Sequence, residues 1–307
     1  MLGSRTSATK ASSDAQPPSH RLLLLPRRQH ILTHREEFTT TAQGAPSFRQ
    51  HGQFPHPTPV INELLLPIEF LFLHVSLLYY GFGIPHGDGS AVVLVPGLAG
   101  TDEYMLPMYL WLGRIGYRPY FSGVGFMADC PRALSAKLHE TICRAYTETG
   151  RRRVHLIGHS LGGIFARAMA THKPEKIASV ISLGSPFRGQ VAHKSVFTVA
   201  GLMRRWMHER NPDLPGECGT SHCSCSFGRS LTGHWPKSVL QTAIYSPNDG
   251  LVDWQHCLTG REGVDVEVQA THLGMPVDAG VYWQIAHRLA LSCRTGRRRP
   301  RPRLKPA

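Results

Sequence analysis

The chain has 307 residues, 41% of them hydrophobic, which is enough to bury the core of one α/β domain and leaves room for extensions. The formal net charge of +13 would fit a nucleic-acid-binding protein, but seven of the basic residues lie in the acid-free, proline-containing segment 294–307. We therefore expect a basic disordered tail over 294–307 and no nucleic-acid partner. Seven cysteines are an odd number in a chain of this length, which argues against a disulfide scaffold.

Residues 1–59 are rich in Ser, Thr, Gln, His, Arg and Pro and show no hydrophobic periodicity, so they are predicted to form a disordered N-terminal extension. The four leucines at 22–25 lie between Arg21 and Arg27 and are too short a run for the core of a secretory signal. Because no clear signal is present, we expect a cytoplasmic or membrane-associated protein.

The most apolar stretch runs from Val60 to Tyr80 and approaches the length of a membrane span. Glu63, Pro67 and Glu69 argue against a span, because charges are costly to bury in lipid. We expect a helix that packs on the following domain. The alternative is an interfacial helix that makes weak contact with a membrane surface.

Strands and helices alternate after the Gly/Pro-rich turn at 81–89. Apolar runs predict strands at 91–95, 118–122, 153–157, 177–183, 238–245 and 264–269, and helices are expected at 104–115, 130–149, 163–172, 190–209 and 281–291. This alternation predicts the α/β class, with a mainly parallel central sheet flanked by helices and a domain that covers 60–293.

The segment around Ser160 has the G-x-S-x-G pattern of a nucleophile elbow, with Gly158 and Gly162 on either side of the serine. The buried strand before it and the helix after it supply the context that the pattern alone lacks. A serine on such a sharp turn needs nearly bare neighbours, so that strand and helix can pass closely. Ser160 is therefore the predicted nucleophile.

A serine nucleophile needs a base, and the base needs an acid to orient it. In the hydrolase arrangement the acid and the histidine follow the serine in that order, at strand ends. Asp249 follows the predicted strand at 238–245, and His272 follows the one at 264–269, so we assign them as acid and base. The competing candidates are Asp253 for the acid and His155, His159, His256 and His287 for the base. The side chain of His159, next to the serine, is expected to point away from the site, because neighbouring side chains diverge at the turn.

The loop after the first strand, Pro96 to Asp102, is glycine-rich. The backbone N–H of Leu98 in this loop is expected to donate to the oxyanion of an acyl-transfer intermediate. The second donor is the N–H of Leu161, the residue after the nucleophile.

Residues 187–236 interrupt the alternation. An insertion between core strands is where a lid or cap is found, and a surface excursion without function is the alternative. Cys218, Cys223 and Cys225, with His222 among them, hint at zinc, but their spacing differs from that of usual zinc ligands. We predict no metal, with a disulfide or free thiols instead.

Several motifs together resemble the α/β-hydrolase superfamily and, within it, bacterial lipase- and esterase-like serine hydrolases. They are G-H-S-L-G-G at 158–163, V-P-G-L-A-G-T-D-E-Y at 95–104, L-G-S-P-F-R-G at 183–189, S-P-N-D-G-L-V-D-W at 246–254 and T-H-L-G-M at 271–275. Two positions depart from the lipase pattern, because Pro96 and Phe187 stand where such lipases usually have histidine. Some bacterial lipases also bind calcium near the histidine loop, but the matching pattern is absent, so no cofactor is expected.

The resemblance implies a carboxylic ester hydrolase that works through Ser160, His272 and Asp249 and an acyl-enzyme, on a small-molecule or lipid ester. Acyl transfer or thioester cleavage on the same triad is the alternative among enzymes, since one fold hosts many chemistries. A non-catalytic scaffold at a membrane surface is the alternative outside enzymes.

Overall fold

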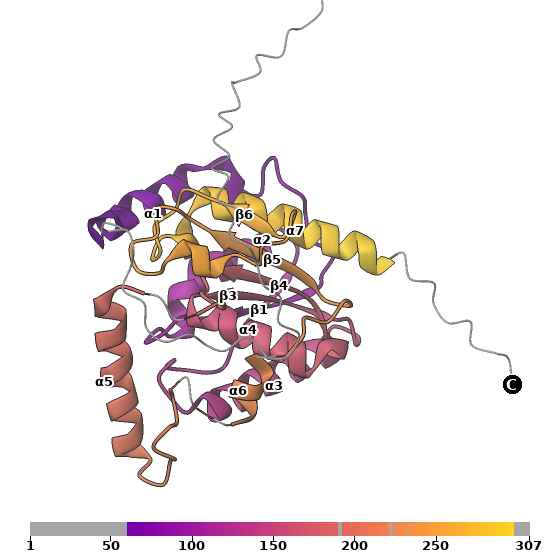
Figure 1. The fold of residues 1–307 in the computed structure, drawn as a ribbon. Coiled ribbons are helices and arrows are strands. Elements are labelled where there is room, and N and C mark those ends of the chain that lie inside the picture. Colours follow the sequence, from indigo (N-terminus) through magenta and orange to yellow (C-terminus); the bar gives the residue numbers. More distant parts are fainter. Residues whose placement is uncertain (1–59, 190–191, 221–222, 224, 232, 298–307) are drawn as a thin grey trace, which may run out of the picture. The chain divides into compact units, whose positions relative to one another are not determined.

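The computed structural model describes residues 60–189, 192–220, 223, 225–231 and 233–297 (Figure 1), and only the backbone for 293–297. The predicted N-terminal extension 1–59 and most of the predicted basic tail, 298–307, lie outside the described residues. Residues 294–297, which we expected at the start of that tail, are helical instead. The closing helix therefore runs further than its apolar pattern indicated.

A six-stranded, fully parallel sheet forms the centre of the domain, with strand order β2-β1-β3-β4-β5-β6. The strands are β1 Ala91–Val95, β2 Arg118–Phe121, β3 Val154–His159, β4 Ile177–Leu183, β5 Leu240–Tyr245 and β6 Asp265–Glu267. Strand β2 lies on one side of β1, and strands β3 to β6 follow in sequence order on the other side. The strand order reverses next to β1, where open α/β sheets place their sites at the carboxyl ends of the strands. The predicted fold class is confirmed.

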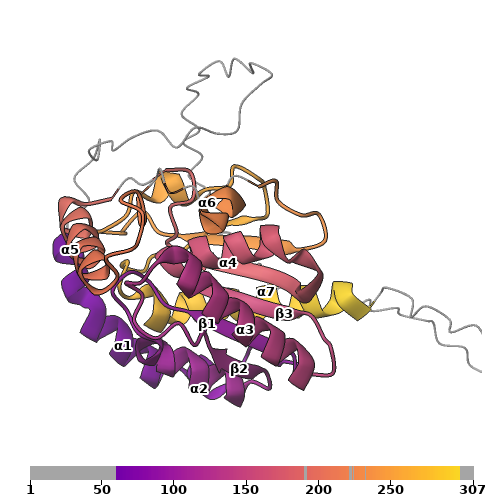
Figure 2. The ribbon, with the colours of Figure 1, turned by 90° about the horizontal axis from the view of Figure 1, so that it is seen from below.

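The helices cover both faces of the sheet (Figures 1 and 2). They are α1 Leu66–Val75, α2 Leu106–Arg114, α3 Pro131–Glu148, α4 Leu161–His172, α5 Lys194–Arg210, α6 Ser226–Leu231 and α7 Ala279–Arg297. Short 3₁₀ turns complete the list at 60–65, 77–80, 102–105, 174–176, 254–257 and 275–277. Six predicted strands and five predicted helices are present, with ends that differ by a few residues. The short helix α6 was not predicted.

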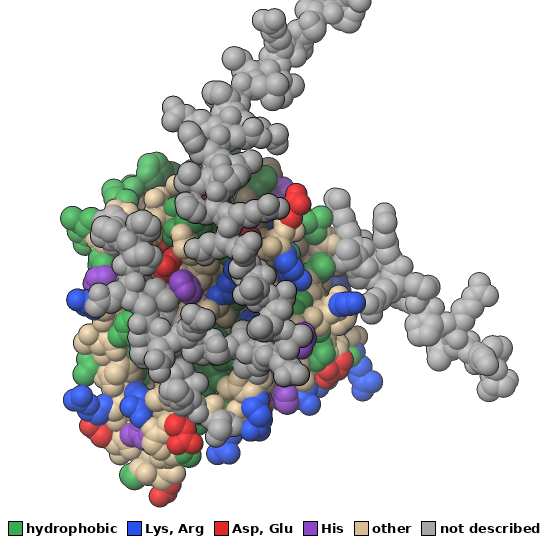
Figure 3. All heavy atoms as spheres, viewed as in Figure 1, with side chains coloured by type: hydrophobic (Ala, Val, Ile, Leu, Met, Phe, Trp, Pro, Cys, Tyr) green, Lys and Arg blue, Asp and Glu red, His purple; other side chains and the backbone are tan. Residues whose placement is uncertain are grey.

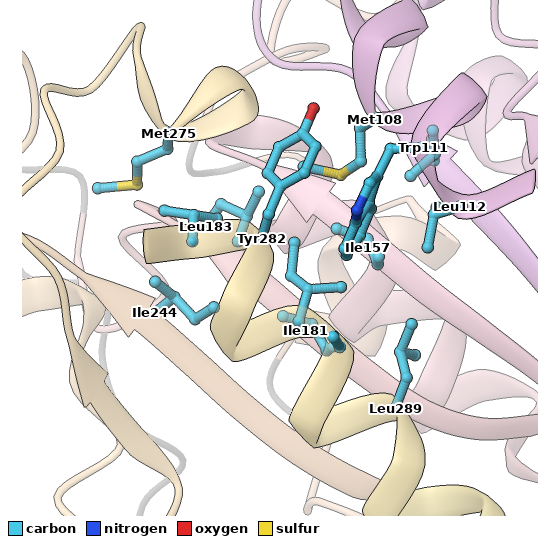
Figure 4. Close-up of a cluster of buried hydrophobic side chains, with 14 of the residues drawn as sticks. Met108, Trp111, Leu112, Ile157, Ile181, Leu183, Ile244, Met275, Tyr282 and Leu289 are labelled. Atoms are coloured by element: carbon cyan, nitrogen blue, oxygen red, sulfur yellow. The ribbon is translucent and has the colours of Figure 1, made fainter. Parts of the chain in front are cut away.

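Two apolar cores lie on the two faces, and the alternation along β1 assigns its side chains to them. Val92 and Leu94 pack with α2 and α7, whereas Val93 and Val95 pack with α3 and α4. In the first core, Trp111 of α2 lies against Tyr282 of α7, with ring centroids 4.5 Å apart (Figure 4). Both side chains are fully buried, so this core holds the closing helix firmly on the sheet.

The apolar stretch 60–80 is not one helix but three short pieces: a 3₁₀ turn (60–65), α1, and a second 3₁₀ turn (77–80). Pro67 lies in the first turn of α1, where its missing N–H costs nothing. The stretch packs on the domain as expected, through the fully buried Leu73 and through Tyr79. Among the described helices none is both long and apolar enough to cross a bilayer.

Candidate active site

Ser160 lies between the last residue of β3 and the first residue of α4, with φ of 52° and ψ of −120°. This left-handed backbone is strained for a residue with a side chain. A Cβ on Gly158 would clash with the backbone of Gly162, and a Cβ on Gly162 would clash with the carbonyl oxygens of Val95 and Pro96. The two glycines therefore allow β3, α4 and β1 to approach closely and force the turn that carries the serine.

Asp249 and His272 lie in the loops that follow β5 and β6. The imidazole Nδ1–H of His272 donates to Asp249 Oδ2 over 2.6 Å, and both side chains are almost completely buried. Asp249 Oδ1 accepts the backbone N–H groups of Leu251 and Val252 at 2.9 and 2.7 Å. The carboxylate is thus fixed on one side by the backbone and presents its other oxygen to the imidazole.

The end of β4 connects this acid–histidine pair with the serine. The carbonyl of Leu183 accepts the backbone N–H of Ser160 at 2.8 Å. The next residue, Gly184, has a positive φ of 53°, and a Cβ on it would come within 3.1 Å of Asp249 Oδ2 and of His272 Nδ1. The three residues that the sequence singled out therefore gather around one strand end.

The protonation of His272 is set by its partners. Burial alone would lower the pKa of His272, but the charge and hydrogen bond of Asp249, with the charge of Glu63, raise it above the ordinary 6.5. With the proton of the neutral ring on Nδ1, the other nitrogen, Nε2, is a hydrogen-bond acceptor. An acceptor of this kind is what a general base requires.

The competing candidates have other roles. Asp253 Oδ1 accepts the backbone N–H of Gln255 at 3.0 Å and caps the 3₁₀ turn at 254–257. The ring of His155 is buried beside the sheet, where Nδ1 lies 2.8 Å from Ser179 Oγ. His256 pairs with Asp253 at 3.4 Å, and His287 bonds the backbone of its own helix.

His159, next to the serine, was expected to point away from the site, but it links two of its loops. Its Nε2–H donates to the backbone carbonyl of His272 at 3.0 Å, and its Nδ1 accepts the hydroxyl of Tyr104 at 2.9 Å. That hydroxyl oxygen in turn accepts the backbone N–H of Gly97 at 2.6 Å. Burial lowers the pKa of His159 to about 3, so the ring is neutral and can both donate and accept.

The loop after β1 is braced from several sides. Asp102 accepts the backbone N–H and the hydroxyl of Ser122 and the backbone N–H of Gly123. The backbone N–H of Ala99, which has a φ of 56°, donates to the carbonyl of Met127. Within the described part of the chain, the backbone N–H groups of Leu98 and Leu161 have no acceptor. Both residues line the cavity described next.

A cavity of about 470 Å³ opens beside Ser160. Its wall is mostly apolar and combines the α/β domain with the insertion at 187–236. The lining includes Leu161 and Ile164 of α4, Ala200, Met203 and Met207 of α5, and Phe227 of α6. The insertion is therefore part of the site's wall, and a lid movement stays a prediction.

The insertion carries Cys218, Cys223 and Cys225, all of them free thiols. Among the described residues, no three His, Cys, Asp or Glu side chains are arranged to hold a metal ion. His222, the fourth residue of the suspected zinc motif, lies outside the described residues. The Sγ atoms of Cys218 and Cys130 are 3.4 Å apart, and both are free thiols.

The chain is similar to known proteins over part of its length. A family model described as a PGAP1-like alpha/beta domain matches residues 132–214, which include the serine turn. A triacylglycerol lipase of Pseudarthrobacter phenanthrenivorans is 36% identical over 106 residues, or 32% of this chain and 33% of that lipase. A triacylglycerol lipase of Pseudomonas fragi is 34% identical over 180 residues, or 52% of this chain and 54% of the lipase.

Among solved structures, a monoacylglycerol lipase of Paleococcus ferrophilus is similar, with 17% identity and a TM-score of 0.48 over 68% of this chain and 97% of that one. The chain spans about a third of the length of the first two curated lipases that it matches. The parallel sheet and the strand–serine–helix turn have the α/β-hydrolase arrangement, and over parts of its length the chain is similar in sequence to bacterial triacylglycerol lipases.

Proposed function

We propose that this protein is a serine hydrolase that cleaves carboxylic esters, with Ser160 as nucleophile, His272 as general base and Asp249 as the acid that orients it. The observation that carries the proposal is the buried 2.6 Å bond from His272 to Asp249 at the strand end that also bonds the backbone of Ser160. A buried, aligned acid–imidazole pair beside a strained serine is the arrangement that activates a hydroxyl at neutral pH.

In the first half-reaction, Ser160 Oγ attacks the ester carbonyl carbon while its proton moves to His272 Nε2. The tetrahedral intermediate collapses when the bond from carbon to the alcohol oxygen breaks and the imidazolium returns the proton to that oxygen. In the second half, water loses a proton to Nε2 and attacks the acyl-enzyme. The acid product leaves, and the proton returns to Ser160 Oγ. Asp249 stays ionised and stabilises the imidazolium throughout.

We assign the backbone N–H groups of Leu98 and Leu161 as the donors that stabilise the oxyanion of the tetrahedral intermediate. Support comes from their lack of another acceptor in the described chain and from their position in the cavity wall beside Ser160. Each such donor contributes about 3 kcal/mol to transition-state stabilisation in enzymes of this kind. The bonds of Asp102 and Tyr104 would keep the loop in place as charge develops.

The substrate is proposed to be an ester with an apolar acyl chain. The cavity beside Ser160 is mostly lined by aliphatic, methionine and phenylalanine side chains, and apolar walls favour apolar ligands. The curated relatives named triacylglycerol lipases point in the same direction. The insertion 187–236 would then act as the wall, or the lid, of an acyl pocket.

Contact with a lipid surface is a second proposal, carried by the outer face of the stretch 60–82. Leu64, Phe72 and Leu77 are 73%, 65% and 70% exposed, and hydrophobic side chains gather over α1 (Figure 3). Exposed apolar patches of this kind mark interaction surfaces. Acyl transfer and thioester cleavage remain alternatives on the same residues, and a non-catalytic scaffold is the alternative outside enzymes.

Hydrolysis of p-nitrophenyl esters of increasing acyl length, by the parent and by Ser160→Ala, tests the proposal. We expect turnover by the parent and a loss of more than about a thousandfold in the variant. The acyl length with the highest kcat/KM distinguishes an esterase from a lipase. A folded parent that turns over no ester, but binds lipid vesicles as well as the variant does, would replace the enzyme proposal with the scaffold.

A further inference from the structure

Glu63 connects the two loops that carry Asp249 and His272. Its Oε1 accepts the backbone N–H of Gly250 at 2.9 Å and that of His272 at 3.0 Å. Its Oε2 accepts the backbone N–H of Leu273 at 2.8 Å. One carboxylate thus joins the residue after the acid to the histidine itself and to the residue after it.

This carboxylate comes from a distant part of the sequence. Glu63 precedes His272 by 209 positions and lies in the 3₁₀ turn at 60–65, outside the alternating strands and helices. Neither loop supplies a partner for these three N–H groups from its own sequence. A carboxylate is suited to the task because it only accepts hydrogen bonds, and charge-assisted bonds to backbone N–H are stronger than neutral ones.

Glu69 provides a natural comparison six residues later, in α1. Its Oε1 accepts the backbone N–H of Thr271 at 2.7 Å, and its Oε2 accepts the Thr271 hydroxyl at 2.7 Å. Glu69 therefore holds the same histidine loop but does not reach the loop of Asp249. The difference separates two effects: seating the N-terminal segment on the domain, and fixing the acid loop relative to the histidine loop.

The placement matters because the bond between His272 and Asp249 spans two loops from two different strands. A relative shift of the loops would lengthen or misalign this bond, and misplacement of reacting groups by about 1 Å costs up to about a hundredfold in rate. The shared oxygen of Glu63 holds the N–H of Gly250 and the N–H of His272 at nearly equal distances. It fixes the two loops at the point where their spacing determines the pair's geometry.

We propose that Glu63 is a positioning residue that sets the distance between the acid loop and the histidine loop, and so the alignment of His272 with Asp249. The kinetic consequence rests on the proposed function, and the structural one rests on the three hydrogen bonds that Glu63 accepts. The charge of Glu63 also faces His272 and would stabilise the imidazolium as it forms.

The test compares Glu63→Gln with Glu69→Gln in the full chain. At position 63 the amide nitrogen of a glutamine is a donor facing the donor N–H of Leu273 or of Gly250 and His272, so at least one bond is lost. At position 69 the amide can accept from the N–H of Thr271 through its oxygen and donate to the Thr271 hydroxyl, so both bonds survive. The two substitutions remove the same charge from the same segment.

We expect Glu63→Gln to lower kcat for ester hydrolysis by about 10- to 100-fold with KM nearly unchanged, and Glu69→Gln to stay within about threefold of the parent. Thermal unfolding of both variants checks that they are folded. In the proton NMR spectrum, the low-field resonance of the hydrogen-bonded His272 Nδ1 proton should shift or broaden in Glu63→Gln and persist in Glu69→Gln.

An unchanged kcat and an unchanged Nδ1 resonance in Glu63→Gln overturn the inference. Equal losses of kcat in both variants, together with equal losses of thermal stability, also overturn it. They would mean that both carboxylates only attach the N-terminal segment to the domain. The NMR measurement does not require that the protein turns over an ester. If the parent hydrolyses no ester, the proposed function fails, and the Nδ1 resonance still decides whether Glu63 aligns the pair.

Discussion

The stretch 60–80 and the insertion 187–236 both lie outside the alternation of strands and helices, yet they contact the site in different ways. The insertion contributes apolar side chains to the cavity beside Ser160. The N-terminal stretch contributes carboxylates that bond the backbone of the loops carrying Asp249 and His272. On the proposals above, the insertion selects the substrate and the N-terminal stretch aligns the acid–histidine pair.

The largest expected effect is on stability, where the N-terminal stretch packs on the domain. Leu73 is fully buried in the core that contains Trp111 and Tyr282, so Leu73→Ala should lower the free energy of unfolding by about 2–5 kcal/mol. Leu71 in the same helix is 62% exposed, and Leu71→Ala should change it by less than about 0.5 kcal/mol. Urea unfolding measures both. If acyl-length preference changes in folded Leu73→Ala, the division between the two regions is wrong.

A smaller effect, on selectivity, is expected from the insertion. Ala200 lines the cavity, so the added ring in Ala200→Phe should lower kcat/KM for long acyl chains about 10- to 100-fold relative to short ones. The neighbouring Val199 is 37% exposed and does not line the cavity, so Val199→Phe should leave the ratio unchanged. Kinetics across the p-nitrophenyl ester series measures the ratio. A matching change in both variants would mean that α5 does not form the acyl wall.

The smallest expected effect is on the pH dependence of kcat/KM, to which the N-terminal stretch contributes the charge of Glu63. The groups that face His272 are Asp249 and Glu63, which raise its pKa, and the neutral ring of His159. Because only the neutral imidazole acts as base, kcat/KM should fall about tenfold per pH unit below a midpoint above 6.5. The Ala200→Phe variant carries no charge change and should keep the parent's midpoint. A parent midpoint below 6.5 would contradict the assignment of His272 as base.

Much of this architecture is local and therefore predictable from sequence. The buried strands are short apolar runs, and the turn at Ser160 needs small residues on both sides, so the pattern indicates both the element and the nucleophile. Asp249 and His272 follow strands in a known order. Each of these signals lies within a dozen residues, where hydrophobic period and glycine spacing can be interpreted. Their position at the same edge of the sheet then follows from the parallel strands.

The parts that were missed depend on contacts between distant segments. In a hydrophobic stretch, Glu63 and Glu69 were interpreted only as an argument against a membrane span, because their partners are backbone N–H groups about 200 positions away. A backbone donor has no sequence signature. His159 was expected to point away because neighbouring side chains diverge at the turn, and its partners, the carbonyl of His272 and the hydroxyl of Tyr104, are likewise distant in the sequence.

The link from Glu63 to the two loops changes where the working unit of this protein begins. A minimal domain drawn around the alternating strands and helices alone would begin after the stretch 60–80, at about residue 81, and a shortened chain starting there would retain Ser160, Asp249 and His272. It would lack the carboxylate that bridges Gly250 and His272. Complementation is then a natural readout: a separate peptide covering 60–80, added to the shortened chain, would supply this acceptor and, on our proposal, restore the alignment of the pair.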